Sequence, residues 1–143
     1  MTEFDRVIDE ALTKVDDYRL VKLYNQSEEN FKKYCDGFLI SAIPNFTHCR
    51  QSLAYNLEAR QFEYDLTSME ISILANLWVI EWYAKDNHNV AQYRQHLQNS
   101  GSFKNHSEAQ NLKEHSAHID KLREEIDRQM VAYQLEDLSS YLV

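Results

Sequence analysis

Residues Leu66–Asp86 read LTSMEISILANLWVIEWYAKD and form the most apolar segment of the chain. Thr67 and Glu70 open it with the T-x-x-E pattern of a capping box, in which each side chain bonds the backbone N–H of the other residue. Two apolar stripes then recur at helical spacing, Ile71, Leu74, Ala75, Trp78 and Trp82 on one face and Ile73, Leu77 and Ile80 on another. A helix that is apolar on more than one side is normally enclosed by several partners. The segment therefore predicts a central core helix over about residues 67–86.

The composition indicates one soluble, helical domain. A chain of 143 residues can bury a sizeable core, and two glycines with one proline favour long helices over a turn-rich β fold. The formal net charge of −8 argues against nucleic-acid binding and against attraction to an anionic membrane. The two cysteines are too few for a disulfide framework. The sequence shows no charged-then-apolar leader and no membrane span, so we expect synthesis in the cytosol without secretion by a cleavable signal.

Shorter helices are predicted before the central one. The first should be capped by Thr2 and broken at Asp16-Asp17, with a helix or an arm continuing to Tyr24. The second should start at Ser27 and break at Pro44, and Gly37 inside it suggests close packing or a bend. A third, shorter helix is expected over residues 45–57, followed by an extended segment at 58–64 that has no evident sheet partner.

After the central helix the pattern predicts a short helix around Val90–Leu97, a loop at 99–102 and a long C-terminal helix over about 108–133. Ser107 and Gln110 would cap the long helix as an S-x-x-Q box. Its seam follows a seven-residue repeat of Leu112, Ile119, Ile126 and Tyr133, with His115, Leu122 and Gln129 between them. The sequence thus predicts an all-α bundle with terminal arms.

The apolar end of the chain is the candidate interface. We expect a single helical domain over residues 1–133 and a C-terminal arm or docking tail over 134–143. The apolar residues of this tail are Leu135, Leu138, Tyr141, Leu142 and Val143. The tail can return to its own core or dock on a neighbouring molecule, and the sequence leaves both alternatives open.

The histidines and cysteines lack the spacing of known metal sites. His106, His115 and His118, with Glu114, contain neither H-E-x-x-H nor the paired E-x-x-H helices of di-iron bundles. A site built from Cys35, Cys49 and His48 lacks the close cysteine pair of structural zinc sites. A metal-dependent helical enzyme using the three histidines is therefore the weakest functional hypothesis.

Other catalytic or binding patterns are also missing from the sequence. His48 and Cys49 are adjacent and would point about 100° apart on a helix, so they would not form a nucleophile–base pair. Gly37 and Gly101 cannot make a phosphate-binding loop. Trp78, Trp82 and Tyr83 lack the flanking arginines of a base-stacking platform and are better explained by core packing. We expect no enzyme and no cofactor.

One run of residues resembles a family of small virion proteins of tailed bacteriophages. The resemblance covers roughly residues 42–133 and is clearest in Phe62-x-x-Asp65-Leu66-Thr67-x-x-Glu70, Ile73-Leu74-Ala75-x-Leu77 and Glu81-Trp82. It continues in Phe103-Lys104, Ser107, Ala109, Leu112-Lys113, Met130 and Tyr133. Tyr83-Ala84-Lys85-Asp86 stands where the family commonly has Pro-Gln after the tryptophan helix.

The resemblance implies a neck or head-completion protein, an adaptor without catalytic activity that joins the portal vertex of the capsid to the tail. The implied partners are the portal protein and the tail or a second neck protein. The chain is further implied to form a ring of about twelve copies in the neck of the virion. The alternative from the residues alone is a soluble helical phage or bacterial regulator that binds one host protein.

Overall fold

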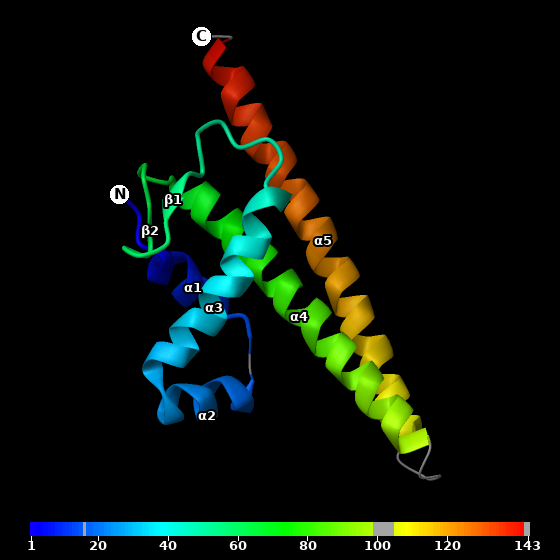
Figure 1. Ribbon diagram of the computed structural model, residues 1–143. Coiled ribbons are helices and arrows are strands. Elements are labelled where there is room, and N and C mark those ends of the chain that lie inside the picture. Colours follow the sequence, from blue (N-terminus) through cyan, green and yellow to red (C-terminus); the bar gives the residue numbers. More distant parts are fainter. Residues whose placement is uncertain (16, 99–104, 142–143) are drawn as a thin grey trace.

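The computed structural model describes residues 1–15, 17–98 and 105–141 (Figure 1). The side chains of residues 86–98, 105–112, 115, 137 and 139–141 lie outside that description. The elements are, in order, α1 (Phe4–Leu12), α2 (Tyr18–Gln26), α3 (Glu28–Ala42), the 3-10 turn η1 (Ile43–Asn45), β1 (Tyr55–Asn56), β2 (Gln61–Phe62), α4 (Ser68–Gln98) and α5 (Asn105–Tyr141). The prediction of an all-α fold with a central helix and a long C-terminal helix is confirmed.

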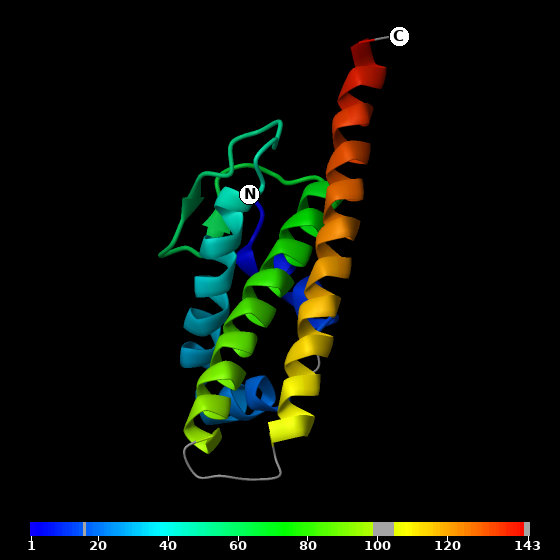
Figure 2. The ribbon, with the colours of Figure 1, turned by 90° about the vertical axis from the view of Figure 1, so that its right-hand side faces the viewer.

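The central helix, α4, lies between α5 on one side and α1 and α3 on the other (Figures 1 and 2). α4 and α5 run antiparallel as a long hairpin, and α4 supplies the middle of the core. Trp78 is fully buried, with its ring edge-on to Phe38 at 5.2 Å between centroids. Its indole N–H donates to the carbonyl oxygen of Cys35 at 2.9 Å, so the one polar atom of this side chain is satisfied.

Local sequence signals set several helix ends as predicted. The Thr67 amide donates to Glu70 Oε1 at 2.8 Å, and the Glu70 amide donates to Thr67 Oγ1 at 3.2 Å, which confirms the capping box. Ser27 caps α3 by accepting from the Asn30 amide at 3.2 Å. α3 ends at Ala42, and Pro44 lies in the 3-10 turn that follows.

Both long helices extend further than the sequence suggested. α4 continues from the apolar segment to Gln98, so the separate short helix around Val90–Leu97 is wrong, and those residues belong to α4. α5 begins at Asn105, which puts Ser107 inside the first turn instead of at the N-cap, and it continues to Tyr141. α4 and α5 contact each other, and tertiary packing of this kind can outweigh a polar composition.

The predicted third helix over 45–57 is also wrong. After η1 the chain is irregular until β1, which pairs antiparallel with β2 through Tyr55↔Phe62 and Asn56↔Gln61. The two strands form a hairpin that the sequence reading did not expect. Arg60, just before β2, has a left-handed φ of 54°, a conformation that costs an L-residue about 1–2 kcal/mol.

A charged cluster compensates for the strain at Arg60. The Arg60 guanidinium donates to Asp36 on α3 at 2.7 and 2.8 Å and to Asp5 on α1 at 2.8 Å. The backbone carbonyl oxygen of Arg60 accepts from the Phe4 amide at 2.9 Å. The hydrogen bond with Asp36, together with that of Asp5, raises the pKa of Arg60 despite partial burial. The cluster ties the hairpin to two helices.

The predicted cap at Thr2 is wrong, and so is close packing, one of the two alternatives predicted for Gly37. Glu3 is the N-cap of α1, while the hydroxyl oxygen of Thr2 instead accepts from the Leu66 amide at 2.9 Å. At Gly37 a side-chain methyl group would meet nothing within 4 Å, so this glycine does not serve close packing against the described parts of the chain.

Candidate functional site

The C-terminal part of α5 carries apolar side chains on two opposite faces. The inner face packs against α4 through buried Ile119, Leu122, Ile126 and Tyr133. The outer face presents Val131, Leu135 and Leu138, which are 55%, 56% and 56% exposed and are called the outer stripe below. At 100° per residue the outer stripe lies roughly 140–200° around the helix from Tyr133. It therefore points away from α4.

The outer stripe lies toward an end of α5 that projects from the body of the molecule. In both ribbon views this end extends past the start of α4 and past the chain between η1 and β1 (Figures 1 and 2). Nearer the middle of α5 the same face is charged, with exposed Asp120 and Glu124. The face thus changes from charged to apolar toward the projecting end.

This end is also acidic. From Gln129 to the end of the chain there is no Lys or Arg, whereas Glu136 and Asp137 are negative. No basic residue stands in the last turn of α5, where the negative end of the helix dipole would favour one. The projecting end therefore combines apolar contact area with acidic residues, of which Glu136 pairs with Arg50.

A buried carboxylate at the start of α4 anchors α5 below the projecting end. Glu70 is 2% exposed, and its Oε2 accepts from the Tyr133 hydroxyl at 2.6 Å. Gln51 and Cys49, from the segment between η1 and β1, also donate to this carboxylate. With the Thr67 amide, Glu70 has four donors from three parts of the chain. The capping box is thus also the junction between α4, α5 and that segment.

These bonds decide the charge state of the junction. Burial acts to raise the pKa of Glu70, but the hydrogen bonds from Tyr133, Thr67, Gln51 and Cys49 together outweigh it, so the pKa lies below its ordinary value. Burial and the bond to Glu70 raise the pKa of Tyr133 to about 12. Burial likewise raises the pKa of the Cys49 thiol, which is therefore a poor nucleophile at neutral pH. The arrangement is suited to holding α5 in place on α4.

Arg50 braces the same helix from outside. Its guanidinium lies 4.0 Å from the centre of the Tyr133 ring and pairs with Glu136 at 3.6 Å, while its amide donates to the Tyr133 hydroxyl at 2.9 Å. Phe46 packs edge-on to the same ring at 5.5 Å. Tyr133 is therefore held both at its hydroxyl and around its ring.

The tail residues predicted as an interface fall into two groups. Leu135 and Leu138 are exposed on α5 and do not return to the core. Tyr141 is the last residue of α5, with its side chain outside the described part, and Leu142 and Val143 lie outside the described residues. Sequence reasoning missed Val131, although its i, i+4, i+7 relation to Leu135 and Leu138 was available.

The residues weighed for metal binding are not brought together. His118 is exposed beside the Tyr83 ring at 5.1 Å, and the side chains of His106 and His115 are outside the described part. Cys35 is buried, which raises its pKa to about 12. Within the described side chains, no three His, Cys, Asp or Glu residues gather as a metal site would require.

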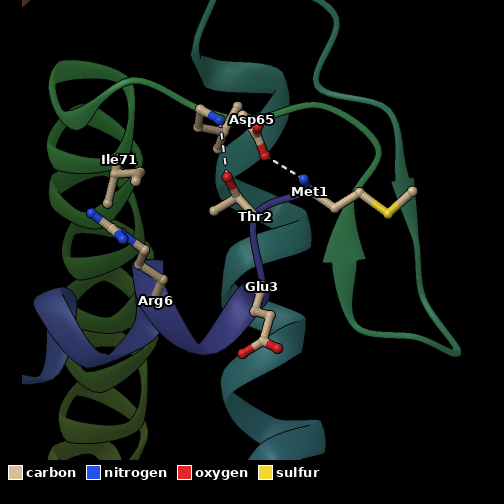
Figure 3. Close-up of a pocket in the computed structure, with 7 residues that line it drawn as sticks. Met1, Thr2, Glu3, Arg6, Asp65 and Ile71 are labelled. Carbon is tan, nitrogen blue, oxygen red and sulfur yellow. Dashed lines mark hydrogen bonds and ion pairs between the residues drawn. The ribbon is translucent and has the colours of Figure 1, made fainter.

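A cleft of 390 Å³ lies beside the N-terminus, where contacts hold the first residues of the chain in place (Figure 3). It is lined by Met1, Thr2, Glu3, Arg6, Asp65, Leu66 and Ile71. The Met1 amino group pairs with the Asp65 carboxylate, and the Leu66 amide donates to Thr2. These contacts already occupy polar groups on one wall of the cleft. We therefore interpret the cleft as the place where the N-terminal segment is attached next to the start of α4.

Among the helices in the described ranges, none combines the length and apolar character needed to cross a membrane. Comparison of the chain with protein-family models, with curated proteins and with solved structures finds no match in any of the three.

Proposed function

We propose that this chain is a structural adaptor of a tailed-bacteriophage particle that joins the portal vertex of the capsid to the tail. The observation that carries the proposal is the outer stripe of Val131, Leu135 and Leu138 on the projecting end of α5. An apolar helix face directed away from its own core is typical of a surface that another protein covers. The resemblance of residues 42–133 to neck proteins supplies the biological setting.

The anchoring of α5 supports a structural role. An adaptor must hold its binding surface at a fixed angle. Tyr133 is fixed between Glu70, Arg50 and Phe46, and it lies two residues from both Val131 and Leu135 of the outer stripe. Rigid surfaces lose less conformational entropy on binding than flexible tails do. The helical continuation of α5 to Tyr141 therefore favours docking of a preformed helix.

The proposed partners are the portal protein on one side and the tail or a second neck protein on the other. We propose further that the chain acts as a ring of about twelve copies in the virion neck, as closed cyclic symmetry allows. Neither catalysis nor a cofactor is part of this proposal. The net charge of −8 supports a role that involves no sequence-specific nucleic acid and no membrane attachment, because acidic surfaces repel DNA phosphates and anionic lipids.

The test is to locate the chain in purified virions by mass spectrometry and single-particle imaging. We expect it in the particle, between portal and tail, and we expect particles made with Leu138→Asp to lack tails. Glu124→Gln, on the same face nearer the middle of α5, is the matched control and should give normal particles. Absence of the wild-type chain from tailed virions would contradict the proposal and favour a regulator that binds a host protein.

A further inference from the structure

A layer of polar side chains lies in the seam between α4 and α5. The side-chain amide of Asn76 donates to Gln129 Oε1 at 2.6 Å, and the side-chain amide of Gln129 donates to Ser72 Oγ at 3.1 Å. Asn76 is 5% exposed, and its side-chain oxygen accepts from Lys14, just after α1. A buried polar group with partners adds little to stability, but one that loses its partner costs much more. The layer therefore penalises any arrangement of α5 that breaks it.

The apolar part of the seam would permit a second arrangement. Its residues Ile119, Leu122 and Ile126 are buried and belong to the seven-residue repeat that also contains Gln129 and Tyr133. Moving α5 by seven residues toward its C-terminal end would put Leu122 in the place of Gln129. The same movement would put Ile126 in the place of Tyr133. Apolar residues would still face α4 in this shifted register, which differs from the observed one by about 10 Å along the helix.

The opposite shift is already disfavoured by the sequence. It would bring Glu136 to the place of Gln129, and Gln129 to the buried place of Leu122. The shift toward the C-terminal end buries no carboxylate. The six residues that connect Gln98 to Asn105 can span up to about 20 Å when extended, so the length of the connection permits this shift.

The shifted register is penalised at two polar groups of α4. Asn76 would face Leu122 and lose its acceptor on α5. Glu70 would face Ile126 and lose the hydroxyl of Tyr133. Both groups are buried, so water cannot replace the lost partners at little cost. In helix seams a single polar side chain can specify the register, at some cost in stability.

We propose that Gln129 and Tyr133 form a register lock, which holds α5 in one of the two registers that the apolar repeat alone would allow. The lock sets how far the projecting end extends, because the shifted register would carry the outer stripe about 10 Å further past the start of α4. The inference goes beyond the adaptor function and does not depend on it, since it concerns the free chain. Whatever covers the outer stripe, the lock determines where along the molecule the stripe is presented.

The experiment moves the lock by one repeat. The triple variant Leu122→Gln/Gln129→Leu/Tyr133→Phe places the polar side chain seven residues earlier and removes the hydroxyl that holds the observed register. The exchange at positions 122 and 129 leaves the composition unchanged. We expect α5 of this variant to shift by seven residues, so that the new amide at position 122 meets Asn76.

Nuclear Overhauser effects between aromatic rings report the register at two places on α5. In the observed register the rings of Tyr83 and His118 lie 5.1 Å apart, and those of Phe46 and Tyr133 lie 5.5 Å apart. A movement of about 10 Å separates both pairs, so the triple variant should lose both signals. The contact of the Trp78 ring with its neighbour in the core should remain, because it does not involve α5.

Tyr133→Phe alone is the matched control, because it removes the hydroxyl but leaves the layer around Gln129 intact. It should keep both ring contacts. A triple variant that also keeps both contacts would overturn the proposal, because the register would then not follow the polar residues. A triple variant that circular dichroism shows to be unfolded would overturn it too. The shifted register would then be no competitor that a lock has to exclude.

Discussion

Tyr133 and Leu135 are two residues apart on α5 and have opposite surroundings. Tyr133 is 1% exposed and bonded to Glu70, whereas Leu135 is more than half exposed on the outer stripe. The same turn of helix therefore belongs both to the core and to a surface that no described part of the chain covers. The comparison teaches that hydrophobicity alone does not tell a core residue from an interface residue. The position of the residue around the helix axis decides which of the two faces it occupies. Substitutions on the two faces should differ in what they damage.

The largest effect is expected in the core that the inner face completes. Trp78→Ala should lower the free energy of unfolding by about 3–5 kcal/mol, because it leaves a cavity and removes the indole bond to Cys35. Urea titration followed by circular dichroism measures this loss. Tyr18→Ala is the control, since Tyr18 is mostly exposed and its removal should cost less than about 0.5 kcal/mol. A loss below about 1 kcal/mol at Trp78 would show that α4 is not the centre of the core.

An intermediate effect is expected at the junction of α4 and α5. Glu70→Gln should cost about 1–3 kcal/mol at pH 7, because an amide cannot accept all four donors that reach the buried carboxylate. The folded-state pKa of Glu70 lies below its ordinary value of 4.5, so its contribution is full above pH 4.5 and is lost as the pH falls through the folded-state value. The difference between wild type and variant should therefore shrink in acid.

Urea titrations at neutral pH and at successively lower pH measure that difference. Glu124→Gln is the control, because Glu124 is exposed and pairs at i, i+4 with exposed Arg128 at 3.7 Å. A difference that grows as the pH falls would mean that the carboxylate is not stabilised by its donors.

The smallest effect on stability is expected on the outer stripe. Leu135→Ser should change the free energy of unfolding by less than about 0.5 kcal/mol, because the side chain is already more than half in water. The same substitution should hinder tail attachment in the particle, which imaging of purified virions detects. A large loss of stability would place Leu135 in the core and remove the contrast with Tyr133.

The sequence was sufficient for features that neighbouring residues determine. The capping box at Thr67 and Glu70, the cap at Ser27 and the break at Pro44 each depend on residues within one turn. The seven-residue repeat also placed Ile119, Ile126 and Tyr133 correctly on the inner face. Gln129, in the same seam, is accommodated by donating to Ser72 and accepting from Asn76.

Features that depend on residues far apart in the sequence could not be predicted from local patterns. Residues 46–54 have helical spacing, yet they are held in an irregular course by bonds of Gln51 and Arg50 to Glu70 and Tyr133. The hairpin depends on Arg60 in a left-handed conformation, which a sequence pattern would assign to glycine. The projecting end of α5 was recognised as apolar, but its direction depends on Tyr133, whose anchor lies 63 residues earlier in the chain.

Because Glu70 both caps the start of α4 and holds Tyr133, a single carboxylate links the two longest helices just below the projecting end of α5. The direction in which the α5 end points thus depends in part on a residue of the other helix. A substitution at Gln51 or Thr67 could tilt the helix while every residue of the outer stripe stayed the same. Two related chains could in this way share an identical docking surface and still build rings of different diameter.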